Sequence, residues 1–308
     1  MGVLDGKVAI VTGAGRGIGR GEALELAANG AAVVVNDLGG EWDGTGADTR
    51  PAQLVVDEIV AAGGRAVANY DDVADWAGGE RLINQAVEAF GSLDILVNNA
   101  GILRDKMVFN MSEDDWDAVM RVHLKGHFVP TRHACAYWRA RSKQAGGAPV
   151  GGRIVMTSSS SGLIGAVGQS NYGAAKAGIA AFAQIVSMEM GRYGVTCNAI
   201  SPAARTRMTE RTFGDIAAGD DFDEWAPENI APLVAYLGTD AAAHITGQVF
   251  YVFGGTVELF EPWRHERVIT KDRRWTVQEL SARVPELFDG MPTAYQPQAS
   301  DLRQALSS

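Results

Sequence analysis

The stretch Lys7–Arg20, KVAIVTGAGRGIGR, decides the fold. It opens with a short apolar run typical of a buried strand and passes through a glycine-rich turn into a helical pattern that ends at Gly30. Gly13, Gly17 and Gly19 permit positive φ angles and let the backbone approach a diphosphate at the N-terminus of that helix. Their spacing differs from the commoner GxGxxG pattern, and such a loop alone can be a simple tight turn. Other signals must therefore decide.

A second apolar run, residues 32–36, ends at Asp37, which lies at the distance from the glycine loop expected for an acid that binds ribose. A carboxylate there accepts hydrogen bonds from both adenosine ribose hydroxyls and repels a 2′-phosphate, which favours NAD. Arg16, inside the glycine loop, favours NADP instead because it could pair with that phosphate. Asp37 carries more weight, since a phosphate beside it would place like charges together. NAD is the expected cofactor and NADP the alternative.

Apolar runs and helical patterns alternate along the chain up to about residue 255 without a break that resembles a linker. This alternation predicts an α/β fold, a doubly wound parallel sheet of about seven strands with helices on both faces. We expect a single Rossmann domain at residues 1–255. Residues 256–308 do not continue the pattern and form a C-terminal extension, in which Thr276 and Glu279 make a possible capping box.

The segment 152–181, GRIVMTSSSSGLIGAVGQSNYGAAKAGIAA, is where we expect the chemistry. Tyr172 and Lys176 are four residues apart in a helical pattern and so share one face. A free phenol has a pKa of about 10, and a nearby ammonium is expected to lower it. Ser159, at the mouth of the preceding strand, could hydrogen-bond a substrate oxygen. The three residues predict a proton-transfer site for an alcohol and ketone pair, although a YxxxK pair alone is more often structural.

Polar residues also follow other predicted strands. Asp72 and Val73 could flank an adenine ring, although turn chemistry explains them equally well. Asn99 lies in the run DILVNNAG, where buried amides need hydrogen bonds and could tie neighbouring strands together beneath a cofactor. Ser112 opens a long helical segment that continues to Trp138 and contains His123. A lone helix histidine is usually structural.

Composition excludes several classes of function. A net charge of −10 and a pI near 5.0 argue against a nucleic-acid partner. The two cysteines, Cys135 and Cys197, are far apart and give neither a disulfide framework nor metal-ligand spacing. No apolar run approaches the ~20 residues that cross a membrane, and no leader precedes the first strand. We expect a cytoplasmic enzyme without a metal ion or a membrane partner.

Taken together, TGAGRGIG, Asp37, NNAG and the set Ser159, Tyr172 and Lys176 resemble the short-chain dehydrogenase/reductase family over roughly residues 5–255. Each motif is weak alone, but the ordered set is specific. The sequence is similar to the branch formed by the (3R)-hydroxyacyl-CoA dehydrogenase part of peroxisomal multifunctional enzymes, also called 17β-hydroxysteroid dehydrogenase type 4, and bacterial stand-alone relatives. The shared segments are VVVNDLGG, VANYD, NNAGILRD, RVHLKG, GQSNYGAAK, TRMT and IAPLV.

The resemblance implies hydride transfer between NAD and a secondary alcohol, such as the 3-hydroxyl of an acyl-CoA or a hydroxysteroid. It makes Tyr172 the general acid/base, Lys176 the group that lowers its pKa and holds the nicotinamide ribose, and Ser159 the group that positions the substrate oxygen. Most members have asparagine where this chain has His123, in a proton relay behind the lysine, so His123 becomes a candidate. The resemblance implies a cofactor site of Gly13, Arg16, Gly17, Ile18, Gly19, Asp37, Asp72, Val73, Asn99, Gly101, Tyr172, Lys176 and Thr206.

Two alternatives stay open. Arg16 favours an NADPH-dependent 3-oxoacyl reductase acting on acyl carrier protein or CoA substrates, and a catalytically idle NAD-binding scaffold is a reading from another class. Family members are commonly homotetramers or homodimers, which we carry over as an expectation. Arg205, Arg207 and Arg211 lie in a lid-like segment and could meet the phosphates of CoA, although the sequence favours solvated arginines over this hypothesis.

Overall fold

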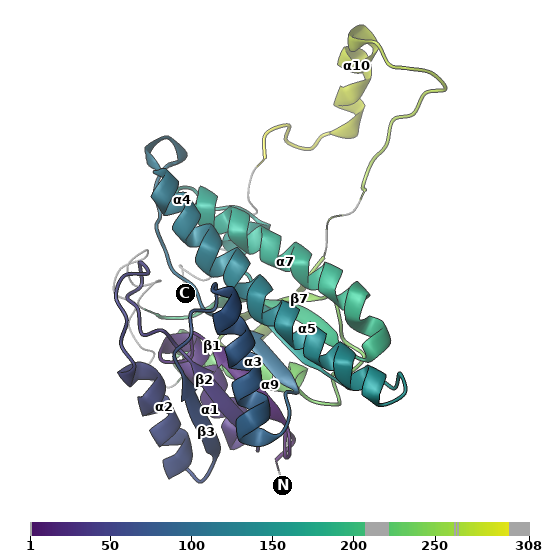
Figure 1. The fold of residues 1–308 in the computed structure, drawn as a ribbon. Helices are drawn as coiled ribbons and strands as arrows, with labels where there is room; N and C mark the ends of the chain where they lie inside the picture. Colours follow the sequence, from purple (N-terminus) through teal and green to yellow (C-terminus); the bar gives the residue numbers. More distant parts are fainter. Residues whose placement is uncertain (1, 207–221, 262, 264, 296–308) are drawn as a thin grey trace. The chain divides into compact units, whose positions relative to one another are not determined.

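The computed structural model describes residues 2–206, 222–261, 263 and 265–295 (Figure 1). Within these residues eight strands form one sheet in the order β3-β2-β1-β4-β5-β6-β7-β8. The order reverses at β1, which pairs with β2 on one side and β4 on the other, so a crevice is expected at the carboxyl end of β1. The strands are β1 (Val8–Thr12), β2 (Ala32–Asn36), β3 (Arg65–Asn69), β4 (Ile95–Asn98), β5 (Arg153–Thr157), β6 (Thr196–Ala203), β7 (Val249–Phe253) and β8 (Thr256–Phe260).

The predicted Rossmann fold is confirmed, and β8 is an addition to it. β1 to β7 are parallel, whereas β8 pairs antiparallel with β7 through a tight turn at Gly254, which has a φ of +51°. Val257 and Leu259 on this edge strand are exposed. The compact unit that holds the sheet therefore runs to Phe260, slightly beyond the predicted boundary at residue 255, and a second unit follows it.

Helices cover both faces of the sheet, as its uninterrupted apolar strands require. Leu26 of α1, Ile59 of α2 and Val234 of α9 belong to the core on one face. Leu82 of α3, Trp138 of α5 and Ile179 of α7 belong to the core on the other face, over which Figure 1 shows α3, α5 and α7. Among the described residues, the helices of the first unit are α1 (Gly17–Ala28), α2 (Arg50–Ala61), α3 (Trp76–Phe90), α4 (Glu113–Met120), α5 (Gly126–Gln144), α6 (Ser160–Leu163), α7 (Ser170–Met190) and α9 (Ala231–Leu237).

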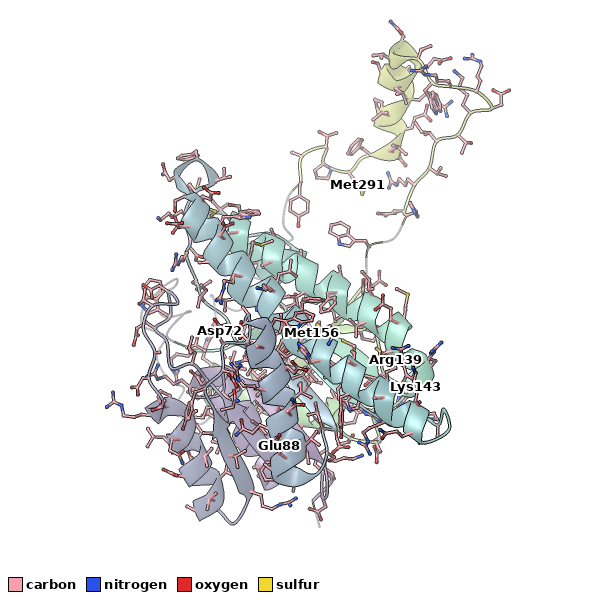
Figure 2. The ribbon with its side chains drawn as sticks, viewed as in Figure 1. Asp72, Glu88, Arg139, Lys143, Met156 and Met291 are labelled. Carbon is pink, nitrogen blue, oxygen red and sulfur yellow. The ribbon has the colours of Figure 1, made fainter. Side chains whose placement is uncertain are left out.

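Figure 2 shows the same division in its labelled side chains. Met156 of β5 lies in the core, whereas Glu88 of α3 and Arg139 and Lys143 of α5 are exposed to solvent. In the second unit α10 (Val277–Arg283) begins with the predicted capping box, in which Thr276 and Glu279 satisfy each other's backbone N–H groups. None of the described helices combines the length and the apolarity that a membrane crossing requires.

The long helix predicted from Ser112 is interrupted. Ser112 and Asp115 form a capping box at the start of α4, but residues Arg121–Lys125 form a π-helix, η2, before α5 begins. In a π-helix each backbone hydrogen bond spans five residues, whereas it spans four in an α-helix. Such segments occur frequently at functional sites. Here η2 carries His123. Short 3₁₀ segments complete the fold: η1 (Val108–Asn110), η3 (Gly191–Tyr193), η4 (Pro227–Ile230) and η5 (Val284–Leu287).

Candidate active site

The predicted site residues lie at the carboxyl edge of the sheet, on the segments that follow β1 to β6. At the end of β1, Gly13 has a φ of +64°, and a Cβ atom there would lie 2.7 Å from the Cα of Ala100. A Cβ on Gly19 would lie 2.4 Å from the carbonyl oxygen of Gly13. The backbone is therefore packed so tightly at Gly13 and Gly19 that neither position can carry a side chain.

This loop fits a dinucleotide diphosphate. Arg16 is the N-cap of α1, and among the described residues no side chain caps the free N–H groups of the first turn, which also contains no acid. Uncapped N–H groups at a helix N-terminus attract an anion. Thr206 lies beside the loop, with its Cγ2 atom 3.6 Å from the position of a Cβ on Gly17. Ile18 packs on the core beneath it.

Asp37 and Asp72 end the next two strands. The carboxylate of Asp37 accepts hydrogen bonds from the N–H of Gly15 at 2.8 Å and from the N–H of Gly39 at 2.6 Å. It is thereby held against the glycine loop, where the adenosine ribose would lie. Asp72, labelled in Figure 2, instead forms a 2.6 Å ion pair with Arg121 of η2 and caps the following turn.

Val73 and Asn99 hold the walls of this crevice. Val73 is buried, and its Cγ2 atom lies 2.9 Å from where a Cβ on Gly126 would be. Asn99 donates its backbone N–H to the hydroxyl of Thr12 at 2.9 Å and its side-chain amide to the carbonyl of Thr12 at 3.1 Å. The amide ties predicted for this run are thus present between β1 and β4. Gly101 allows the ring of His123 to approach, because a Cβ there would lie 2.4 Å from the Cε1 atom.

Ser159, Tyr172 and Lys176 come together beside the crevice. Ser159 follows β5, and its hydroxyl is close enough to the phenol of Tyr172 that it acts to lower the pKa of Tyr172. The ammonium of Lys176 lies 5.4 Å from the centroid of the Tyr172 ring and donates to the carbonyl of Thr157 at 2.6 Å. The structure therefore brings all three predicted groups into one cluster.

Burial opposes charge on both members of the tyrosine–lysine pair. It raises the pKa of Tyr172 to about 12, to which the charge of Asp105 also contributes, and it lowers the pKa of Lys176 to about 7. The predicted lowering of the Tyr172 pKa is thus wrong for the protein alone. The same desolvation that packs the phenol beside the ammonium disfavours both charged forms, so additional interactions must stabilise the pair before Tyr172 can act as a base.

His123 is buried in η2 and contacts the catalytic cluster. Its ring packs edge-on against Tyr172 with 5.1 Å between centroids. Its Nε2 lies 3.1 Å from the N–H and 2.7 Å from the carbonyl oxygen of Ile102, and the tautomer decides which of the two it binds. Burial holds the pKa of His123 well below its usual value, so the imidazole is neutral. His123 thus anchors the π-helix to the loop after β4.

Asn171 is a site residue that sequence reasoning missed. It is fully buried, and its side chain accepts the N–H of Tyr172 while donating to the carbonyls of Arg104 and Asp115, both at 3.1 Å. It therefore fixes the start of α7 to the loop after β4 and to α4. An open cavity of about 530 Å³ is lined by this same loop, including Arg104 and Asp105. A buried asparagine directly before the tyrosine was the available sequence signal.

Of the three arginines in the lid-like segment, the structure describes only Arg205. Arg205 forms an ion pair with Asp223, and both side chains are only 22% exposed. The positive charge of Arg205 is therefore paired with Asp223, which belongs to the acidic run that follows the lid-like segment. Arg207 and Arg211 lie outside the described residues. In the part of the chain that the structure describes, no group of three potential ligand side chains is placed to hold a metal ion.

An open parallel sheet, a glycine cradle at its switch point and a tyrosine–lysine pair on the adjoining helix are together typical of oxidoreductases that use a nicotinamide dinucleotide. A family model described as short chain dehydrogenase matches residues 7–216. The chain therefore belongs to the short-chain dehydrogenase/reductase family.

Known relatives extend this similarity beyond the nucleotide site. Hydroxyacyl-CoA dehydrogenase ChsB1 of Mycobacterium tuberculosis is 48% identical over 307 residues, which cover 97% of this chain and 94% of that protein. Peroxisomal multifunctional enzyme type 2 of Drosophila melanogaster is 52% identical over 233 residues, 76% of this chain but only 36% of that protein. The crystal structure of a short chain dehydrogenase from Mycobacterium avium has a TM-score of 0.85 at 52% identity and covers 96% of this chain and 99% of its own.

Proposed function

We propose that this oxidoreductase interconverts a (3R)-3-hydroxyacyl-CoA thioester and its 3-oxo form, with NAD as the hydride carrier. The observation that carries the proposal is the convergence of Ser159, Tyr172 and Lys176 beside a dinucleotide cradle. The substrate class is supported by the similarity to a hydroxyacyl-CoA dehydrogenase along nearly the whole chain. A hydroxysteroid is a second candidate, since its ring hydroxyl is also a secondary alcohol.

The chain's own residues divide the work. Ser159 donates to the substrate oxygen and orients it towards Tyr172, which takes the hydroxyl proton during oxidation and returns it during reduction. Lys176 supplies positive charge near the phenolate. The N–H groups at the start of α1 and the side chain of Asp37 would hold the dinucleotide, which supplies hydride acceptance when it is bound. His123 positions the helix that packs against Tyr172.

The preference for NAD over NADP is supported by the charges near the ribose. Asp37 is fixed against the glycine loop by two backbone N–H groups, so it remains where a 2′-phosphate would have to lie. The charge of Arg16 also acts on Asp48, whose pKa is lowered first by its hydrogen bonds with Arg50. If Arg16 nevertheless binds a 2′-phosphate, the alternative of an NADPH-dependent 3-oxoacyl reductase applies.

A substrate panel tests the proposal. Rates are measured for (3R)- and (3S)-hydroxyacyl-CoA thioesters of several chain lengths and for hydroxysteroids, each with NAD and with NADP. The proposal predicts the highest kcat/KM with a (3R)-hydroxyacyl-CoA and NAD. A preference for NADP and 3-oxoacyl substrates would favour the reductase alternative, and no turnover of any compound, with intact NAD binding, would favour the scaffold.

A homo-oligomer in the cytoplasm is part of the proposal. Phe128 of α5 and Ile185 and Met188 of α7 are 42%, 48% and 74% exposed, respectively. Apolar side chains in such a group on long helices are commonly covered by another protein surface. Analytical ultracentrifugation should show a dimer or tetramer, and a monomer at micromolar concentration would contradict this point.

A further inference from the structure

Four buried polar atoms without a hydrogen-bond partner belong to residues around Lys176. Among the residues that the structure describes, they are Asn98 Oδ1, His123 Nδ1, His127 Nε2 and Thr157 Oγ1. Each of these side chains is at most 6% exposed. Most buried polar groups in proteins are hydrogen-bonded, so unpaired ones call for a physical explanation. Four such atoms at one place point to a common role.

Contacts place these groups in one cluster. The ammonium of Lys176 donates to the carbonyl of Thr157, and β4 pairs with β5 beside it at Asn98. The backbone carbonyls of His123, Asn98 and Thr157 act to raise the pKa of His127, and the charge of Lys176 acts to lower the pKa of both histidines. The cluster therefore lies around the buried side chain of Lys176.

Lys176 has hydrogen-bond donors to spare, and the residues around it have unused acceptors. An ammonium has three N–H donors, and within the described residues Lys176 uses one of them, towards Thr157. The unpartnered atoms of the cluster are acceptors when the imidazoles present a lone pair. Burial, with a smaller contribution from the charge of Lys176, lowers the pKa of His127 to about 3. His127 is therefore a neutral neighbour of the ammonium and not a competing cation.

We propose that His127 is a positioning residue of the active site, whose neutral imidazole completes with Asn98 and Thr157 a polar shell that stabilises protonated Lys176, directly or through water. The inference rests on the proposed proton transfer by Tyr172 and Lys176. His127 touches neither substrate nor dinucleotide. Its imidazole stabilises the charged form of Lys176, which burial disfavours, and the ammonium in turn favours the phenolate of Tyr172.

The groups that titrate near this shell are few. Lys176 faces Tyr172 on its own helix and the two histidines His123 and His127 on η2 and α5. Asp105, in the loop after β4, acts on Tyr172. Because both histidines stay neutral, an apparent pKa in the alkaline part of the rate profile belongs to the coupled Tyr172 and Lys176 pair.

Replacing His127 tests the inference. His127→Leu removes the acceptor, His127→Gln keeps one, and His133→Leu is the matched control. His133 is a buried histidine on the same helix whose Nε2 is also unpartnered, but its ring packs on Trp76 and not near Lys176. For each variant, kcat/KM for alcohol oxidation is measured against pH, together with NAD affinity and the thermal midpoint of unfolding.

In His127→Leu the ammonium loses support, so the ascending limb of kcat/KM should move to higher pH by about one unit, with the KM for substrate unchanged. His127→Gln should restore the wild-type midpoint, and His133→Leu should leave it in place. A wild-type profile in His127→Leu, or an equal shift in His127→Gln and His133→Leu, would overturn the inference. If His127→Leu does not fold, Thr157→Val replaces it, because it deletes the Oγ1 atom and keeps the carbonyl. That variant should shift the limb in the same direction, and an unchanged profile would count equally against the inference.

A readout without turnover separates this inference from the proposed substrate. In the NAD-bound protein, the ultraviolet absorption of the Tyr172 phenolate is titrated as the difference between each variant and the same variant carrying Tyr172→Phe. The midpoint should be higher in His127→Leu than in the wild type even if no hydroxyacyl-CoA is turned over. Equal midpoints would refute the role of His127, whereas a shifted midpoint in a protein inactive on the substrate panel would refute only the proposed function.

Discussion

Glu22 allows a prediction about stability whose size follows from its burial. It lies on α1 with no exposed surface, and neither carboxylate oxygen has a hydrogen-bond partner among the described residues. Burial raises its pKa from 4.5 to about 8. The folded protein therefore holds a neutral carboxylic acid at neutral pH, where an unfolded chain has a carboxylate. At neutral pH the carboxylate of Glu22 must therefore bind a proton when the chain folds, which lowers the free energy of unfolding. Glu22→Gln cannot ionise and so does not carry this cost.

The direction and size of the effect follow from this pKa difference. Because the pKa of Glu22 is higher in the folded protein, its contribution to stability is complete below pH 4.5 and is lost progressively as the pH rises to about 8. The linkage relation gives a loss of about 1 kcal/mol at pH 5, about 3 kcal/mol at pH 7 and about 5 kcal/mol at pH 9. Glu22→Gln should therefore match the wild type near pH 4.5 and exceed it increasingly at higher pH.

The assay is urea unfolding at pH 5, 7 and 9, at one protein concentration and without nucleotide, since both affect apparent stability. Glu88→Gln is the control, because Glu88 is exposed on α3 and should change nothing at any pH. The reasoning is refuted if Glu22→Gln differs from the wild type by the same free energy at pH 5 and pH 9. That result would mean that Glu22 is ionised in the folded protein or has a partner there.

Three further predictions concern the site. Gly19→Ala should weaken NAD binding at least tenfold by calorimetry, because its Cβ would lie 2.4 Å from the carbonyl of Gly13, and unchanged affinity would contradict the cradle. Asn171→Leu should lower kcat far more than it changes NAD affinity, since the start of α7 loses its ties to the loop after β4 and to α4; a normal kcat in stopped-flow assays would count against this. Arg205→Gln should change the KM for a CoA thioester and for the matching pantetheine thioester equally, because Arg205 pairs with Asp223. A selective rise in KM for the CoA compound would restore the phosphate-binding hypothesis.

The sheet and the cofactor cradle could be predicted because their signals are local. An apolar run followed by GAGRGIG and a helical pattern leaves the backbone few alternatives, and Asp37 lies directly at the end of the following strand. Tyr172 and Lys176 share a helix, so their spacing alone put them on one face. Ser159 lies on a different segment, directly after β5. Its position beside Tyr172 therefore depends on how β5 and α7 pack and not on sequence spacing alone.

Other features depend on contacts that spacing does not reveal. The apolar pattern from Ser112 to Trp138 is continuous, yet the helix widens at Arg121–Lys125, where His123 binds a loop from another strand. The sequence left Arg205 either solvated or able to bind a phosphate, whereas in the structure it forms an ion pair with Asp223. The high pKa of Tyr172 also escaped prediction, because a charged neighbour can be read from a sequence, whereas the loss of solvent around a side chain cannot.

The most direct test of the account is the rate of NADH formation from a (3R)-hydroxyacyl-CoA by Tyr172→Phe, measured beside its NAD affinity. In the proposed mechanism Tyr172 exchanges the proton with the substrate oxygen, so we expect a loss of at least about a thousandfold in kcat, with the NAD affinity within a factor of a few of the wild type. A variant that retains wild-type turnover would show that proton transfer occurs elsewhere and would contradict the account.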